Sequence, residues 1–370
     1  MLIAIAAETH PGECRVAATP ETVKKYVAQG HTVRVAPGAG RGAAISDDAF
    51  VAAGATIAAD GNVYAGAELV LKVRAPSEAE LANIPDGAAI IASFDAQRYP
   101  HKRWLADKRL TAFALERMPR TSRAQSMDVL SSQANVAGYR AVLKACQYYP
   151  RFMPMMMTAA GTVKPARVLI LGTGVAGLQA IATAKRLGAV VEAFDVRPVA
   201  REQVESLGAR FIEVPADEGQ SAETSGGYAR EMSADYKARQ AALIAERARE
   251  ADIVITTAQI PGKPAPVLLT PETVETMKQG SVIVDLAVES GGNCPLSRMD
   301  QVVTTPNGVT VLGSGNLPSE LAADASAMFA RNVLTFAALL FDKEAKLALN
   351  FEDDIVEATC IAHQGELKNL

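Results

Sequence analysis

The chain has few cysteines and histidines, and those it has are scattered. Its 370 residues include four cysteines and four histidines, and no two cysteines have the CxxC spacing of a zinc or redox motif. Scattered cysteines of this kind are typical of a reducing cytoplasm, where disulfides do not persist. The sequence therefore predicts neither a disulfide framework nor a metal site. The residues concerned are Cys14, Cys146, Cys294, Cys360, His10, His31, His101 and His363.

The chain also lacks excess positive charge and long hydrophobic runs. Its formal net charge is −4 and its aromatic content is 5%, which argues against a nucleic-acid surface of basic and aromatic side chains. The best candidate for a membrane span, residues 333–341, is much shorter than the roughly 18 residues needed. The N-terminal MLIAIAAETHPGE has no basic region or cleavage site of a signal peptide, so we expect a first strand there.

Strand-like and helix-like segments alternate along the first portion of the chain. Apolar strand patterns cover residues 2–8, 31–37, 68–76, 88–94 and 110–115, and helical patterns cover 20–29 and 47–53. A long helical stretch at 126–147 follows, and then a connector rich in proline and methionine, whose methionines we expect to serve as adaptable packing. This alternation predicts an α/β fold with parallel strands.

A second series of strand-like segments begins at Arg167 and predicts a second doubly wound sheet. Six such segments follow one another up to about residue 313, separated mainly by helical patterns. Residues 317–370 form a long helix and a final segment, which we expect to return to the first domain. The sequence therefore predicts two Rossmann-like domains with a cleft between them: a discontinuous domain of residues 1–129 and 318–370, completed by C-terminal helices, and a domain of residues 130–317.

The segment RVLILGTGVAGLQ is the most informative portion of the chain. An apolar strand runs into Gly172, Gly174 and Gly177 and then into a helical pattern. Gly172 would make the tight turn, Gly174 would let the backbone approach a pyrophosphate, and Gly177 would allow close helix packing. The pyrophosphate would then accept hydrogen bonds from free N–H groups at the helix N-terminus.

The next strand, VVEAFDV, indicates which nucleotide is bound. Asp195 ends this strand about twenty residues after the glycines, where a carboxylate accepts hydrogen bonds from a ribose 2′-OH and repels a 2′-phosphate. The acid therefore favours NAD(H) over NADP(H). Arg197 leaves the alternative open, because an arginine two residues later could pair with a 2′-phosphate.

Two further segments carry candidate site residues. The long loop between Val214 and the charged helix at 237–250 includes Gly227, Tyr228 and Met232, which could close over a bound ring or could belong to a merely solvated insertion. In RTSRAQSMDVLSSQANVAGYRA, the spacing of Gln125, Asp128 and Ser131 predicts a common helical face. The alternative for this second segment is that Ser126 or Asp128 caps a helix.

Several long motifs together resemble the NAD(H)-binding soluble subunit of proton-translocating nicotinamide nucleotide transhydrogenase. They are RTSRAQSMDVLSSQANVAGYRA, MMMTAAGTV, GTGVAGLQAIATAKRLGAVVEAFDVRP, GGYAREM, DIVITTAQIPGKPAP and VIVDLAVESGGN. The resemblance covers nearly the whole chain and extends to alanine dehydrogenase, a relative with the same two-domain fold. It implies direct hydride transfer between NADH on this chain and NADP⁺ on a partner subunit, coupled to proton translocation by membrane-spanning subunits.

The resemblance also implies residue roles. It assigns the nicotinamide loop, and so the hydride-transfer geometry, to Arg120, Gln125, Asp128 and Ser131, with Arg120 paired to Asp128. It assigns NAD(H) binding to Ser126, Met127, Gly172, Gly174, Val175, Ala176, Gly177, Asp195, Val196, Arg197, Gly227, Tyr228, Met232, Thr257, Ala258 and Gln259. It further implies a homodimer docked on the cytoplasmic face of the membrane, without metal or nucleic acid.

Chemistry favours the transhydrogenase over the dehydrogenase. An amino-acid dehydrogenase needs a general acid/base and a group that holds a carboxylate, whereas hydride exchange between two nicotinamides needs neither. Arg15 and Lys72 resemble the dehydrogenase's substrate-binding pair. However, Phe94 and Asp95 stand where that family has its catalytic histidine, and Glu289 replaces its catalytic aspartate. An alanine dehydrogenase and a non-catalytic NAD(H)-sensing module remain the alternatives.

Overall fold

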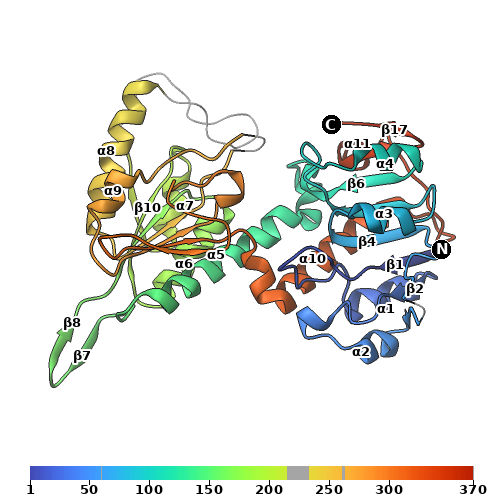
Figure 1. Cartoon of the computed structure of the whole chain (residues 1–370), viewed down its shortest axis with the longest axis horizontal. Helices are drawn as coiled ribbons and strands as arrows, with labels where there is room; N and C mark the ends of the chain where they lie inside the picture. The colour runs from blue at the N-terminus through green and yellow to red at the C-terminus, as the bar shows by residue number, and fades with distance from the viewer. Residues whose placement is uncertain (60, 215–232, 261–262, 370) are drawn as a thin grey trace. The chain divides into compact units, whose positions relative to one another are not determined.

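A computed structural model of the chain describes residues 1–59, 61–214, 233–260 and 263–369. It divides into two compact units, which are treated separately below: unit 1 comprises Met1–Gln133 and Pro318–Leu370, and unit 2 comprises Ala134–Leu317. Both ends of the chain lie in unit 1 (Figure 1).

Unit 1 is built on an eight-stranded sheet in the order β17-β16-β6-β5-β4-β1-β2-β3. The six strands from β3 to β6 are parallel and have the doubly wound order, whereas β16 and β17 pair antiparallel at one edge. The strands are β1 (Leu2–Ile5), β2 (Thr32–Val35), β3 (Thr56–Ile57), β4 (Leu69–Arg74), β5 (Ala89–Ser93), β6 (Thr111–Ala114), β16 (Cys360–His363) and β17 (Glu366–Leu367).

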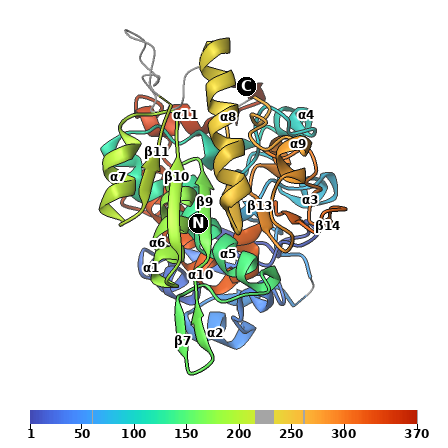
Figure 2. The ribbon, with the colours of Figure 1, turned by 90° about the vertical axis from the view of Figure 1, so that its left-hand side faces the viewer.

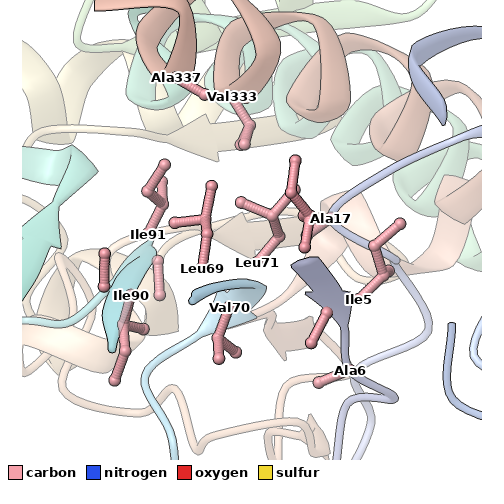
Figure 3. Close-up of a cluster of buried hydrophobic side chains, with 14 of the residues drawn as sticks. Ile5, Ala6, Ala17, Leu69, Val70, Leu71, Ile90, Ile91, Val333 and Ala337 are labelled. Atoms are coloured by element: carbon pink, nitrogen blue, oxygen red, sulfur yellow. The ribbon is translucent and has the colours of Figure 1, made fainter. Parts of the chain in front are cut away.

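Helices cover this sheet because its central strands are apolar on both faces. Alternate residues of a strand point to opposite faces, so Leu69 and Leu71 lie toward Val333 and Ala337 of α10, while Val70 points the other way (Figure 3). The helices of unit 1 are α1 (Pro20–Ala28), α2 (Asp47–Ala52), α3 (Glu78–Asn83), α4 (Lys102–Asp107), α10 (Ala322–Ala337) and α11 (Asp354–Thr359). Short 3₁₀ helices include η2 (Leu115–Arg117) and η3 (Ser122–Met127).

Unit 2 has a seven-stranded sheet in the order β11-β10-β9-β12-β13-β15-β14. Six strands are parallel, and β14 pairs antiparallel with β15 at the edge. The strands are β9 (Arg167–Leu171), β10 (Val190–Phe194), β11 (Arg210–Ile212), β12 (Ile253–Thr256), β13 (Val282–Asp285), β14 (Val302–Thr304) and β15 (Thr310–Gly313). The predicted α/β class with Rossmann-like parallel sheets is therefore confirmed in both units.

Two apolar layers cover the sheet of unit 2. The helices α5 (Val129–Tyr148), α6 (Val175–Arg186) and α7 (Ala200–Ser206) pack on one face, and α8 (Ala234–Glu250) and α9 (Pro271–Glu275) pack on the other. Figure 2 shows α8 on the opposite side of the strands from α6 and α7.

The structure corrects four expectations from the sequence. The helical stretch at 126–147 is broken, because η3 ends at Met127 and α5 begins at Val129. The methionine-rich connector contains a hairpin, β7 (Met156–Thr158) and β8 (Gly161–Val163), which protrudes from unit 2 (Figure 1). Its methionines are exposed, with Met157 at 75%, so they are not packing residues within the chain. The strand β14 was not predicted, and the C-terminal segment adds β16 and β17 as well as helices.

Candidate functional site

Three adjacent parallel strands of unit 2 bring the predicted nucleotide residues together. Gly172 follows β9, Asp195 follows β10 and Thr257 follows β12, and these strands are neighbours in the sheet. Because parallel strands end at the same edge, the three segments meet at the carboxyl end of the sheet, where nucleotides bind in doubly wound folds. Each of the predicted residues of unit 2 that the structure describes lies at this edge or on the helix that begins there.

Two of the fingerprint glycines are required by the chain's own packing. Gly172 has a φ of +97°, and a Cβ there would lie 2.7 Å from Thr257 Oγ1. A Cβ at Gly177 would lie 2.0 Å from the Gly172 carbonyl oxygen. Thr257 Oγ1 also donates to that carbonyl at 3.0 Å, so the turn, the start of α6 and the end of β12 form one close-packed corner.

Gly174 differs from the other two glycines. It is the N-cap of α6 with a φ of −69°, which any residue adopts, and a Cβ built there meets nothing within 4 Å. Neither backbone conformation nor internal packing therefore requires glycine at this position. The following residues, Val175, Ala176 and Gly177, begin the helix, whose first N–H groups lack intrahelical partners. An open approach to these donors is what a phosphate needs.

Asp195 is held by both ends of the turn. Its Oδ2 accepts from the Thr173 backbone N–H at 2.8 Å and from Thr173 Oγ1 at 2.9 Å. Arg197 donates to Oδ1 through Nε and to Oδ2 through a terminal nitrogen, both at 2.9 Å. Between them, Val196 packs against the apolar layer beneath the sheet. The guanidinium that could have paired with a 2′-phosphate is thus engaged by the acid that selects a ribose hydroxyl.

The charge on Asp195 is stabilised despite its environment. Burial raises the pKa of the carboxyl, but the hydrogen bonds and charge of Arg197, with the Thr173 N–H, outweigh burial and hold the pKa below its ordinary value. The carboxylate is therefore ionised throughout the physiological range, as an acceptor for ribose hydroxyls must be.

The segment after β12 is fixed by a residue that the sequence reasoning did not single out. Asn293 is fully buried; its Oδ1 accepts from the Ala258 N–H at 3.1 Å, and its Nδ2 donates to the Ala258 carbonyl at 2.9 Å. Gln259 donates to the Leu286 carbonyl at 3.0 Å. The signal was present in the motif VESGGN, because an asparagine after two glycines is a residue that bonds to backbone in a turn.

The predicted nicotinamide loop belongs to unit 1 and differs from the expected helical face. Gln125 and Ser126 are exposed in η3, Met127 is buried, and the helical geometry is interrupted at Asp128. Asp128 Oδ1 instead accepts from the Ser131 N–H at 3.0 Å, and Ser131 Oγ donates to Oδ2 at 2.5 Å. The alternative that Asp128 caps a helix is therefore correct for this contact, whereas its pairing with the exposed Arg120 stays a prediction.

The remaining candidates have different outcomes. Gly227, Tyr228 and Met232 lie outside the described residues. Within the described ranges, no group of three or more histidine, cysteine, aspartate or glutamate side chains could hold a metal ion. Also within those ranges, none of the helices has the length and apolar character of a membrane span.

The two basic residues of the dehydrogenase pattern are both buried beside carboxylates in unit 1. Arg15 donates to Glu13 through Nε and a terminal nitrogen, each at 2.7 Å, and to Gln133 Oε1 at 2.8 Å. Lys72 Nζ donates to Glu80 Oε1 at 2.7 Å. The positive charges of both side chains are therefore balanced from within the chain.

Comparisons with known proteins agree with this geometry. Two families match, "Alanine dehydrogenase/PNT, N-terminal domain" over residues 4–137 and "Alanine dehydrogenase/PNT, C-terminal domain" over residues 141–369. The chain is 53% identical over 375 residues to the first portion of the NAD(P) transhydrogenase alpha subunit of Rhodospirillum rubrum, covering 99% of this chain and 97% of that protein.

Two solved structures resemble the fold over the same extent. The transhydrogenase from Sinorhizobium meliloti has a TM-score of 0.89 at 47% identity, covering 99% of this chain and all of that one. An L-alanine dehydrogenase has a TM-score of 0.82 at 26% identity, covering 99% of this chain and 96% of that one. The chain therefore belongs to the alanine dehydrogenase/PNT family.

Proposed function

We propose that the chain is the NAD(H)-binding subunit of a proton-translocating transhydrogenase, in which hydride passes directly between NADH on this chain and NADP⁺ on a partner subunit. The observation that carries the NAD(H) assignment is Gly174, a glycine with open space at a helix N-terminus that the chain's own structure does not require. A ligand that approaches the backbone closely explains it.

The residues of unit 2 fit the components of a dinucleotide. The N–H groups at the start of α6 would bind the pyrophosphate, and the ionised Asp195 would accept from the adenosine ribose. We assign the nicotinamide side to Thr257, Ala258 and Gln259, and closure over the nucleotide to Gly227, Tyr228 and Met232. The nicotinamide ring supplies the hydride acceptor or donor carbon when the nucleotide is bound. This chain's residues bind and orient it.

We assign orientation at the reacting ring to Arg120, Gln125, Asp128 and Ser131. Their segment has the two features that such a role needs, since Gln125 is exposed while Asp128 and Ser131 are fixed to each other. Ser126 and Met127 flank them and complete the proposed loop. Positioning of two rings at about 3 to 3.5 Å would supply most of the rate enhancement, so no proton-transferring side chain is required.

The dehydrogenase alternative is weakened by the contacts in unit 1. A keto-acid substrate needs an available cation, but Arg15 is engaged by Glu13, and Lys72 by Glu80. In the place of the dehydrogenase's histidine, Phe94 is buried and Asp95 pairs with Arg98 at 2.8 Å. These contacts support hydride exchange between nucleotides over oxidation of an amino acid.

The partners follow from the same proposal. We assign NADP(H) to a second subunit and proton movement to membrane-spanning subunits, with this chain bound at the cytoplasmic face. A homodimer is supported by the β7–β8 hairpin, because Met155, Met156 and Met157 are exposed on one protruding element. Contiguous apolar side chains on a surface mark an interface, and a second copy would bury them.

The decisive experiment measures hydride transfer from NADH to an NADP⁺ analogue, with and without the isolated NADP(H)-binding partner. We expect turnover only when the partner is present. Parallel assays with pyruvate and ammonium test the alternative: NADH oxidation there, without transfer to the analogue, would establish a dehydrogenase. NADH binding without either activity would point to a sensing module.

A further inference from the structure

The segment that we assign to the nicotinamide is anchored by the C-terminal region of the chain. In the 3₁₀ helix η3, residues three apart share a face, so Ala124 and Met127 are both buried while Ser122 and Gln125 are both exposed. A 3₁₀ helix has strained hydrogen bonds and is stable only in short pieces. Its shape must therefore depend on contacts with its surroundings.

The first anchor is an ion pair that joins η3 to α11. Arg123 donates to both oxygens of Asp353, at 2.6 and 2.7 Å, and also contacts Asp354. Asp353 is itself fixed, because it is the N-cap of α11 and accepts from the Ile355 N–H at 2.9 Å. A two-pronged guanidinium–carboxylate contact sets direction as well as distance. It joins residues 230 positions apart in the sequence.

The second anchor comes from α10. Asn332 is 8% exposed, and its Nδ2 donates to the Ser126 carbonyl oxygen at 2.7 Å. The Oδ1 of the same amide is buried, and no donor among the described residues reaches it. An asparagine that leaves one buried acceptor unsatisfied is costly for stability alone. Its contact with Ser126, next to Gln125, instead gives this amide a positioning role.

A third contact fixes the start of the following helix. Gln133 Nε2 donates to the Ala325 carbonyl of α10 at 3.1 Å, and its Oε1 accepts from Arg15. Residues 123–133 are therefore held at three points, two of which lead to α10 and one to α11. The short stretch between the first two points contains Gln125.

We infer that Arg123 and Asn332 are positioning residues for hydride transfer: they hold Gln125 in place from the C-terminal helices. This inference rests on the proposed function. It predicts that residues far from the nucleotide fingerprint set the transfer rate without setting NADH affinity, because they contact the loop and not the turn after β9. Small displacements of a positioning group cost large factors in rate.

The test compares Arg123→Ala and Asn332→Leu with Arg331→Ala. The control removes an exposed arginine of α10 that pairs with Glu21 at 2.8 Å, so it deletes a comparable surface ion pair elsewhere in unit 1. The full-length chain is mixed with the isolated NADP(H)-binding partner, and single-turnover hydride transfer is measured at saturating NADH beside the Kd for NADH. We expect each test variant to lower the transfer rate about tenfold or more with a Kd within about twofold of the wild type.

Two further readouts separate positioning from general damage. Hydrogen exchange of residues 120–128 should quicken in both test variants and not in Arg331→Ala, while thermal unfolding stays near that of the wild type. Arg123→Lys should recover only a fraction of the rate, because lysine keeps the charge but not the two-pronged contact. Unchanged transfer rates in both test variants, or rate losses matched by equal losses in NADH affinity, would overturn the inference. Absence of transfer in the wild type would instead overturn the proposed function, and exchange would still report the anchoring.

Discussion

At the scale of single residues, the glycine turn shows how one motif serves two purposes. Gly172 and Gly177 are required by sterics inside the chain, whereas the space beside Gly174 is open. The first two make the corner that presents the helix N-terminus. The third leaves that corner accessible, and its effect should therefore be separable by mutation.

Gly174→Ala should weaken NADH binding with little loss of stability. Alanine fits the backbone and meets no atom, so the N-cap change should cost about 1 kcal/mol or less. Its methyl group would occupy the approach to the pyrophosphate donors, and we expect the Kd for NADH to rise about tenfold or more. Calorimetric titration and thermal unfolding measure both quantities.

Gly177→Ala is the matched control for that experiment. Its Cβ would lie 2.0 Å from the Gly172 carbonyl oxygen, and forced overpacking of this kind costs about 3 kcal/mol. We therefore expect a lower unfolding temperature in this variant and not in Gly174→Ala. Equal stability losses with equal NADH affinity would show that Gly174 serves the fold.

Asp195→Asn should shift nucleotide preference toward NADPH. The amide loses the negative charge that repels a 2′-phosphate, and it releases the Arg197 guanidinium, now held at 2.9 Å. We expect the ratio of the NADPH and NADH dissociation constants to fall about tenfold or more, measured by nucleotide fluorescence. In Asp195→Asn with Arg197→Ala, NADPH binding should be lost again. A preference unchanged by Asp195→Asn contradicts the selective role of the acid.

At the scale of elements, helix α5 contains a residue whose role only the packing explains. Gly138 lies in the middle of α5, where glycine costs about 1 kcal/mol relative to alanine. A Cβ there would lie 2.1 Å from the Ala176 carbonyl oxygen at the start of α6. The glycine thus allows two helices to approach each other closely beside the nucleotide turn.

Gly138→Ala should destabilise unit 2 although alanine is the better helix former. The overlap with the α6 backbone should outweigh the gain in helix propensity and leave a net loss of about 2 kcal/mol. Urea denaturation measures the change, with Tyr139→Ala as an exposed control on the same helix. A more stable Gly138→Ala protein would mean that α5 can move away from α6 without cost.

The anchor between η3 and α11 should weaken in acid. The hydrogen bonds from Arg123 lower the pKa of Asp353 to about 2. A carboxyl whose pKa is lowered by folding stabilises the fold above its ordinary pKa of 3.8, and this contribution disappears as the pH falls toward 2. Wild type and Asp353→Asn should therefore differ in urea midpoint at pH 6 and converge between pH 4 and 2. A difference that persists at pH 2 contradicts an origin in the ionised carboxylate.

At the scale of the whole molecule, assembly is the property that the chain's surface predicts. Met157→Glu should shift the proposed homodimer toward monomer, because it places a charge on an exposed apolar hairpin. Sedimentation velocity across a concentration series measures the shift. Val302→Glu, on the exposed edge strand β14, is the control and should leave the dimer intact. Unchanged sedimentation of Met157→Glu would exclude the hairpin from the interface.

Much of the fold and some of the site could be predicted from the sequence. The alternation of apolar strands with helices indicated parallel sheets, and the spacing of Gly172, Gly174, Gly177 and Asp195 indicated a dinucleotide turn. These features are readable because they depend on local periodicity and on backbone demands of neighbouring residues. The long motifs indicated the family, which the similarities to known proteins confirm.

Tertiary structure alone decided the contacts between distant segments. The pairing of β16 with β6, the ion pair of Arg123 with Asp353 and the closeness of Gly138 to Ala176 join residues whose local patterns carry no sign of one another. The break at Asp128 belongs with them, because the helical spacing of 126–147 favours a continuous helix while the anchored η3 interrupts it. Local sequence sets which elements form; the closing of a shared core sets which of them meet, and that choice depends on the whole chain at once.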